Sequence, residues 1–231
     1  IVKTIALIGG MSWESTVDYY KIINQEVKAR LGEPHSAEII MHSVDFAEIE
    51  KLQSAGKWDI LTKKMIDIAH ELETAGADMI LICANTMHQM APAVQKEINI
   101  PLVHIADAAA EKIKGDGYKK VGLLGTKYTM EGDFYKNRIN ENYDIDVIIP
   151  EEKSREYIHQ VIYKELISGI LKEESRKEFK KIIADLKEKG AEAIILGCTE
   201  IPLLIKDKDS SLPVLNTTEL HAKKAVELAL K

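Results

Sequence analysis

Two stretches, Ala77–Thr86 (ADMILICANT) and Ala191–Glu200 (AEAIILGCTE), determine the fold that this sequence predicts. Each is a short apolar run, typical of a buried parallel strand, and each follows a glycine that would end a preceding helix. Each run leads into a cysteine, then into polar residues suited to a helix N-terminus. These cysteines, Cys83 and Cys198, are the only two in the chain. The pattern therefore predicts two equivalent strand ends, one in each half of the protein.

The two halves repeat one another around these strands. Cys83 lies 74 positions after Gly9, at the end of a predicted first strand, and Cys198 lies 73 positions after Gly125, at the end of its counterpart. Strands at residues 37–41 and 146–149 take the second place in each half. Pro101–Val103 and 213–215 are expected to close the halves as further strands. Strands that alternate with helices are typical of parallel sheets built from βαβ units.

We therefore predict an α/β fold of two pseudo-symmetric domains, each a parallel sheet flanked by helices, with the active site in the interdomain cleft. The N-terminal domain is expected to comprise residues 1–104 plus 216–231 and to carry Cys83. The C-terminal domain is expected to comprise residues 105–215 and to carry Cys198. Helices are predicted at about 13–31, 58–73, 158–170, 176–189 and 218–230. Three- and four-residue steps predict the buried face of the first helix: Val17, Tyr20, Ile23, Val27 and Leu31.

Composition excludes several functional classes. The formal net charge of −6 argues against nucleic-acid binding, which requires a basic face. No apolar run approaches the roughly 20 residues of a membrane span. Because the N-terminal residues lead directly into a strand, without a secretory signal pattern, we expect a cytoplasmic protein. No histidine or cysteine cluster has metal-ligand spacing, and no motif identifies a cofactor, so we predict neither a metal nor a cofactor.

The two predicted strand ends suit proton transfer at carbon. Ligands of open α/β sheets bind beyond the carboxyl ends of the strands, where both cysteines are expected. A thiol at a helix N-terminus has a lowered pKa, because the helix dipole favours the thiolate. Two such thiols on opposite faces of a substrate could remove a proton from one face and deliver one to the other. The turns at residues 9–12, 85–86, 126 and 199 offer backbone N–H groups and hydroxyls for a carboxylate.

The motifs GGMSW (9–13), SVDF (43–46), CANT (83–86) and GCTEIP (197–202) resemble the aspartate/glutamate racemase family over essentially the whole chain. The resemblance implies a cofactor-independent enzyme for a small acidic amino acid, on a two-domain α/β fold that is usually a homodimer. It implies Cys83 and Cys198 as the acid/base pair and Lys164 as the positive group for the side-chain carboxylate. The residues that it places against the substrate are Met11, Gln53, Asn85, Thr86, Lys164 and Thr199.

Two departures bear on the substrate. Aspartate-specific relatives carry an arginine in the helix after the second strand, whereas Phe46–Glu50 contains none, so both aspartate and glutamate are candidate substrates. Glu200 stands where glutamate racemases of cell-wall synthesis carry a histidine, which argues against that enzyme.

Three other interpretations stay open. The same scaffold could support cis–trans isomerisation of a small dicarboxylate such as maleate, with a cysteine as nucleophile. It could also form a non-catalytic module that binds an amino acid, and a free cysteine is often only a small buried apolar residue. His88 follows Cys83 closely in sequence, and we assign it no role in the site, as a surface or packing residue.

Overall fold

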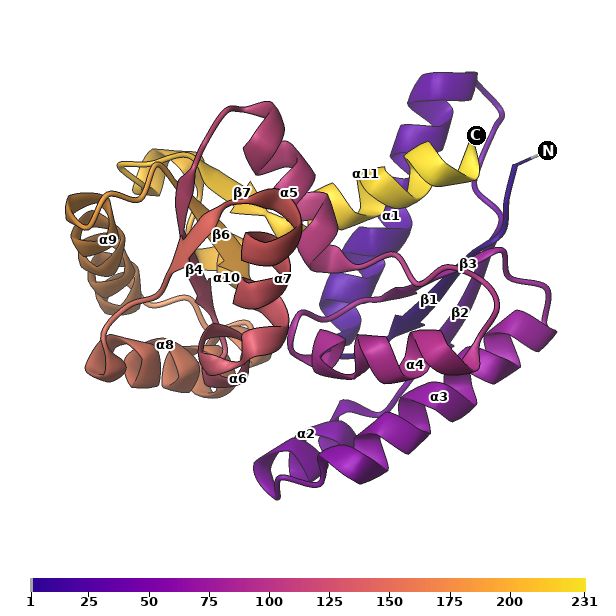
Figure 1. The fold of residues 1–231 in the computed structure, drawn as a ribbon, viewed down its shortest axis with the longest axis horizontal. Coiled ribbons are helices and arrows are strands. Elements are labelled where there is room, and N and C mark those ends of the chain that lie inside the picture. Colours follow the sequence, from indigo (N-terminus) through magenta and orange to yellow (C-terminus); the bar gives the residue numbers. More distant parts are fainter. Residues whose placement is uncertain (1) are drawn as a thin grey trace. The chain divides into compact units, whose positions relative to one another are not determined.

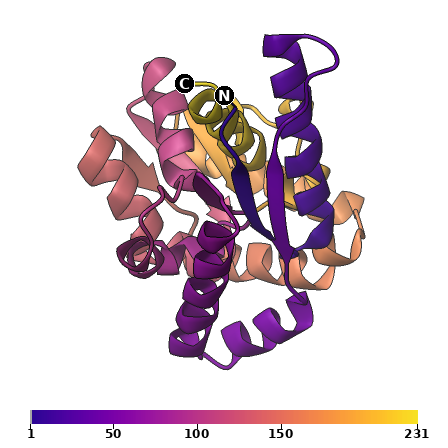
Figure 2. The same ribbon diagram turned by 90° about the vertical axis from the view of Figure 1, so that its right-hand side faces the viewer.

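The computed structural model describes residues 2–231, which divide into two compact units. The first unit extends to Ile105 and also includes His221–Lys231, and the second unit is Ala106–Leu220. The chain therefore passes from one unit to the other after Ile105 and returns after Leu220. Each unit contains one parallel sheet with helices packed against it (Figure 1, Figure 2), which confirms the predicted α/β class.

The first unit contains a three-stranded parallel sheet with the N-terminal strand in its centre. Its strand order is β2-β1-β3, and the bounds are β1 (Ile5–Gly9), β2 (Ile39–Ser43) and β3 (Met79–Ile82). Side chains of β1 and β3 are buried on both faces, which explains their continuous aliphatic sequences. The predicted strand at Pro101–Val103 is wrong: Leu102 forms a single bridge with Ile80. Pro101 has no N–H for a ladder, and α5 begins two residues after Val103.

Helices cover both faces of this sheet. Their bounds are α1 (Trp13–Leu31), α2 (Phe46–Ser54), α3 (Trp58–Thr74), η1 (Thr86–Met90), α4 (Ala91–Glu97) and α11 (Thr217–Ala229). One face packs against α2, α3, η1 and α4, and the other against α1 and α11. Alternate residues of β1 supply the two cores, since Ala6 and Ile8 belong to the first and Ile5 and Leu7 to the second.

The predicted buried face of α1 is partly wrong. Ile23 and Val27 are buried as expected, but Val17 and Tyr20 are more than half exposed, and Tyr19 is buried instead. Leu31 is exposed as well. The spacing of apolar residues mispredicted the buried face because two small hydroxyl residues, Ser15 and Thr16, occupy the buried side of the first turn. Both hydroxyls donate to the carbonyl of Ser12.

The second unit contains a four-stranded parallel sheet of order β5-β4-β6-β7. Its strands are β4 (Lys120–Gly125), β5 (Asp146–Ile148), β6 (Ala193–Gly197) and β7 (Val214–Asn216). Its helical segments are α5 (Ile105–Gly115), which begins at the last residue of the first unit, α6 (Lys127–Glu131), α7 (Asp133–Tyr143), α8 (Glu152–Lys164), η2 (Leu166–Ser168), α9 (Glu173–Glu188), α10 (Ile201–Leu204) and η3 (Asp207–Asp209). The helix predicted at 158–170 thus begins earlier and ends at Lys164.

Two glycines face each other at the carboxyl end of β4 and β6. Gly125 and Gly197 are register partners, and a Cβ atom on Gly125 would lie 2.8 Å from the carbonyl oxygen of Gly197. A Cβ atom on Gly197 would lie 2.7 Å from Leu123 Cδ1 and 2.9 Å from the carbonyl oxygen of Leu124. Close strand contact therefore excludes side chains here, immediately before Cys198.

We predict that Gly197→Ala destabilises the protein by about 1–3 kcal/mol, because its methyl group would overlap with a backbone atom that cannot move aside. Gly115→Ala is the matched control, since a Cβ atom there would have nothing within 4 Å. Urea unfolding followed by circular dichroism measures both variants. Equal unfolding free energies for the two variants would contradict this account of the strand contact.

Candidate active site

The Cys83 turn begins directly at the carboxyl end of the first sheet. β1 and β3 pair in parallel up to Ile8 and Ile82, and the N–H of Cys83 continues the ladder by donating to the carbonyl of Ile8 at 2.9 Å. Gly10 follows β1 at the same edge with a φ of 92°, and a Cβ atom there would lie 2.3 Å from the carbonyl oxygen of Val44. The register therefore places the Gly10 and Cys83 turns side by side.

The predicted substrate contacts of the first unit gather at this edge. Met11 packs in the same apolar cluster as Ala84 and Met87, and the side-chain amide of Gln53 donates to Met87 Sδ at 3.3 Å. All four predicted residues are buried: Met11, Gln53, Asn85 and Thr86. Cys83 itself is fully buried and belongs to the cluster on the other face, against α1 and α11.

Cys198 occupies the corresponding position in the second unit, with a carboxylate beside it. The Cys198 thiol donates to Glu200 Oε2 at 3.1 Å, and the Thr199 hydroxyl donates to the same oxygen at 2.8 Å. All three residues are buried. From the sequence, Glu200 distinguishes subfamilies and has no predicted site role, although its position two residues after the cysteine indicates proximity. The structure adds Glu200 to the candidate site.

The expectation that the two thiols have lowered pKa values is wrong. Burial raises the pKa of the Cys83 thiol. Burial also raises the pKa of Cys198, and the negative charge of Glu200 raises it further. Hydrogen bonds from the N–H groups of Glu200 and Ile201 favour the Cys198 thiolate, but they are outweighed. The helical segments that directly follow the two cysteines are a five-residue 3-10 helix and a four-residue α-helix, so the dipole that each presents to its cysteine is small.

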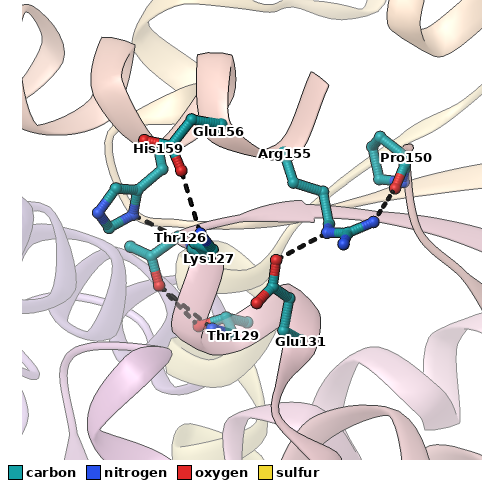
Figure 3. A network of polar contacts seen from close by, with 8 residues as sticks. All are labelled: Thr126, Lys127, Thr129, Glu131, Pro150, Arg155, Glu156 and His159. Carbon is teal, nitrogen blue, oxygen red and sulfur yellow. Dashed lines mark hydrogen bonds and ion pairs between the residues drawn. The ribbon is translucent and has the colours of Figure 1, made fainter. Parts of the chain in front are cut away.

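A polar network joins the turn after β4 to α8 (Figure 3). Thr126 Oγ1 accepts the N–H of Thr129 at 3.2 Å, and the N–H of Lys127 donates to His159 Nδ1 at 3.1 Å. Lys127 Nζ also pairs with Glu156 at 3.1 Å. Burial lowers the pKa of His159, which favours the neutral ring that accepts this hydrogen bond. The sequence predicts that Thr126 in this turn contacts a substrate carboxylate, and in the structure its hydroxyl oxygen accepts the N–H of Thr129.

Lys164 and Arg155 lie near opposite ends of α8. At the start of the helix, Arg155 donates to Glu131 at 2.9 Å and to the carbonyl of Pro150 at 2.7 Å (Figure 3). Lys164 is the last residue of α8 and is exposed, with no acidic ion-pair partner among residues 2–231. The following segment, η2, contacts α10, which begins immediately after Glu200. The segment that begins two residues after Lys164 thus packs close to the Cys198 turn.

A family model described as Asp/Glu/Hydantoin racemase matches residues 8–225. The chain belongs to this family. The match includes both cysteines and every residue that the sequence predicts for the site, and it confirms the predicted family.

Solved structures and a curated relative agree with this assignment. A Yersinia pestis structure described as a candidate Asp/Glu racemase is 49% identical with a TM-score of 0.93, over 99% of this chain and all of that one. An aspartate racemase homologue from Pyrococcus horikoshii OT3 is 38% identical with a TM-score of 0.84, over the same shares. The broad specificity amino-acid racemase RacX of Bacillus subtilis is 26% identical over 74% of each chain. The prediction of an amino-acid racemase is confirmed at the level of the family.

Among residues 2–231, no set of three or more histidine, cysteine, aspartate or glutamate side chains is arranged to hold a metal ion. No helix in the same range combines the length and apolar character that crossing a membrane requires.

We predict that Glu200→Gln makes Cys198 more reactive, because removal of the carboxylate charge lowers the pKa of the thiol. In a Cys83→Ala background, alkylation by iodoacetamide at pH 8 should be about 3- to 10-fold faster, since a larger thiolate fraction outweighs its weaker nucleophilicity. Glu188→Gln, which removes an exposed carboxylate of α9, is the control and should leave the rate unchanged. An unchanged rate in Glu200→Gln would show that Glu200 does not govern this thiol, and a slower rate would show that Glu200 acts on it mainly as a proton acceptor.

Proposed function

We propose that this protein is a cofactor-independent racemase of acidic amino acids, aspartate and glutamate, with Cys83 and Cys198 as its acid/base pair. The observation that carries the proposal is the equivalent position of the two thiols. Cys83 directly follows β3, which pairs with β1, and Cys198 directly follows β6, which pairs with β4. Both thiols therefore lie at the carboxyl edge of a parallel sheet, where α/β proteins bind ligands. The chain belongs to a racemase family, and inversion at carbon needs one proton-transfer group on each face of the substrate. Two thiols in equivalent positions meet this requirement.

In the proposed reaction, one cysteine thiolate removes the α-proton and the other thiol delivers a proton to the opposite face. The first sulfur ends as a thiol and the second as a thiolate, so that the reverse reaction starts from the product state. Since burial raises the pKa of both thiols and favours their protonated form, a base must first form the thiolate. Glu200 Oε2, 3.1 Å from the Cys198 sulfur, is the group placed to accept that proton.

Lys164 supports the choice of an acidic substrate. It is exposed and carries a positive charge that no neighbouring carboxylate neutralises in the described part of the chain. Lys127, in contrast, is paired with Glu156. We therefore propose that Lys164 binds the side-chain carboxylate of the substrate. A flexible lysine can reach carboxylates at two distances, which fits both aspartate and glutamate.

We predict that the wild-type protein converts L-aspartate and L-glutamate to mixtures of enantiomers without added cofactor, as measured by chiral chromatography. Cys83→Ala and Cys198→Ala should each abolish racemisation, because each removes the proton-transfer group for one face. In deuterated water, each variant should still exchange the α-proton of at most one enantiomer. Full racemisation by either variant would contradict the two-base assignment.

The same samples distinguish the alternatives. Conversion of maleate to fumarate, without racemisation, would indicate a dicarboxylate isomerase. Binding of aspartate with neither deuterium incorporation nor isomerisation would indicate a non-catalytic binding module. The homodimer, the cytoplasmic location and the independence from a cofactor stay predictions from the sequence.

For Lys164 we predict that Lys164→Met lowers kcat/KM about 10- to 100-fold for both substrates, the range expected when a hydrogen bond to a charged group is lost. The loss should appear mainly in KM, because the lysine contacts a part of the substrate that does not react. Lys177→Met, which removes an exposed lysine of α9, is the control. Values of kcat/KM within twofold of wild type for both amino acids would exclude the proposed role.

A further inference from the structure

The first unit buries a group of three histidines that the proposed reaction does not use. His88, His104 and His221 are all at most 5% exposed. The ring of His88 lies 4.5 Å from that of His104 and 5.6 Å from that of His221, measured between centroids. The phenol of Tyr19, on α1, continues the group with a hydrogen bond of 2.7 Å to His221 Nδ1. The expectation that His88 has only a surface or packing role is therefore incomplete.

Both nitrogens of the His88 ring have backbone partners. The N–H of Ile105 donates to Nε2 at 3.2 Å, so Nε2 must be the unprotonated nitrogen. Nδ1 lies 2.8 Å from the carbonyl oxygen of Ala84, which can only accept, so Nδ1 carries the hydrogen. A neutral ring therefore connects the residue immediately after Cys83 with the first residue of α5.

His221 forms a second connection in the same place. Its Nε2 donates to the carbonyl oxygen of Val103 at 2.6 Å, while its Nδ1 accepts from the Tyr19 hydroxyl. Val103 and Tyr19 belong to the apolar cluster that also contains Cys83. The segment from Val103 to Ile105 is thus hydrogen-bonded from both sides, by His88 and by His221.

This segment lies where the chain leaves the first unit. Ile105 is the last residue before the chain enters the second unit, and His221 is the first residue after it returns. The two covalent connections between the units therefore meet at the histidine group. We propose that His88 is a positioning residue, which holds the Cys83 turn against the connection at Ile105 so that the position of the thiol depends on that connection.

The two nitrogens of His88 allow a test by conservative substitution. A glutamine side chain can place its amide oxygen near the position of Nε2 and accept from the N–H of Ile105. An asparagine side chain can reach the position of Nδ1 and donate to the carbonyl of Ala84, but it cannot reach Ile105. The contact with Ala84 is local to the turn, whereas the contact with Ile105 joins the turn to the connection. Only His88→Asn therefore removes the link that the proposal requires.

The experiment measures alkylation of Cys83 by iodoacetamide in a Cys198→Ala background, well below the thermal midpoint of each variant. His88→Asn should increase the rate about tenfold, and His88→Gln should stay within about threefold of its parent. His159→Ala is the control: it also removes an imidazole that accepts a backbone N–H, but in the second unit, and it should leave the rate unchanged. Equal rates for His88→Asn and His88→Gln, or no increase in either, would overturn the proposal.

A second pair of variants covers the case in which His88→Asn does not fold. Ile105→Pro removes the donor N–H at the first position of α5, where proline is tolerated, and Ile105→Ala removes most of the side chain but keeps the N–H. Faster alkylation of Cys83 in Ile105→Pro than in Ile105→Ala would support the link, and equal rates would overturn it.

The consequence for turnover rests on the proposed racemase function. With both cysteines present, His88→Asn should lower kcat for racemisation with little change in KM, and His88→Gln should restore most of kcat. The alkylation rates need no catalytic activity, so that a failure of the racemase proposal and a failure of the positioning proposal are distinguishable. A loss in KM alone, with kcat unchanged, would contradict the positioning role.

Discussion

The parallel register of two strand pairs determines where the chemistry of this protein can lie. Ile8 is paired with Ile82, and Gly125 with Gly197, so that each cysteine is the first residue beyond its sheet. A shift of one residue would turn each cysteine to the opposite face of its strand. The register is itself specified by burial, because the aliphatic side chains of β1, β3, β4 and β6 are enclosed.

Equivalent positions do not give the two thiols equivalent surroundings. The Cys198 thiol and the Thr199 hydroxyl both donate to the carboxylate of Glu200. Cys83 instead packs against apolar side chains, and the residue after it is hydrogen-bonded to His88. Burial raises the pKa of both thiols, which lowers their reactivity toward solvent species and makes a nearby base necessary for proton transfer. In this account Glu200 supplies that base at one sulfur, and the reaction itself regenerates the thiolate at the other.

Much of this arrangement could be predicted from the sequence, because it depends on local patterns. The aliphatic runs before Cys83 and Cys198 predicted their strands, and residues 13–31 were correctly predicted to form one helix, α1. The face of α1 could not be predicted, because its buried hydroxyls are satisfied by a neighbouring turn. The thiol pKa values were mispredicted because burial outweighs the short helices. The link from His88 to Ile105 joins residues 17 positions apart, and no local pattern predicts it.

A crystal structure with an acidic amino acid bound would show directly whether the two sulfur atoms flank one carbon atom. We expect the Cys83 and Cys198 sulfurs on opposite faces of the substrate α-carbon, each at about 3.5 Å, the separation of groups poised to react. Both sulfurs on the same face, or one of them too far from the α-carbon to exchange a proton with it, would contradict the two-base mechanism.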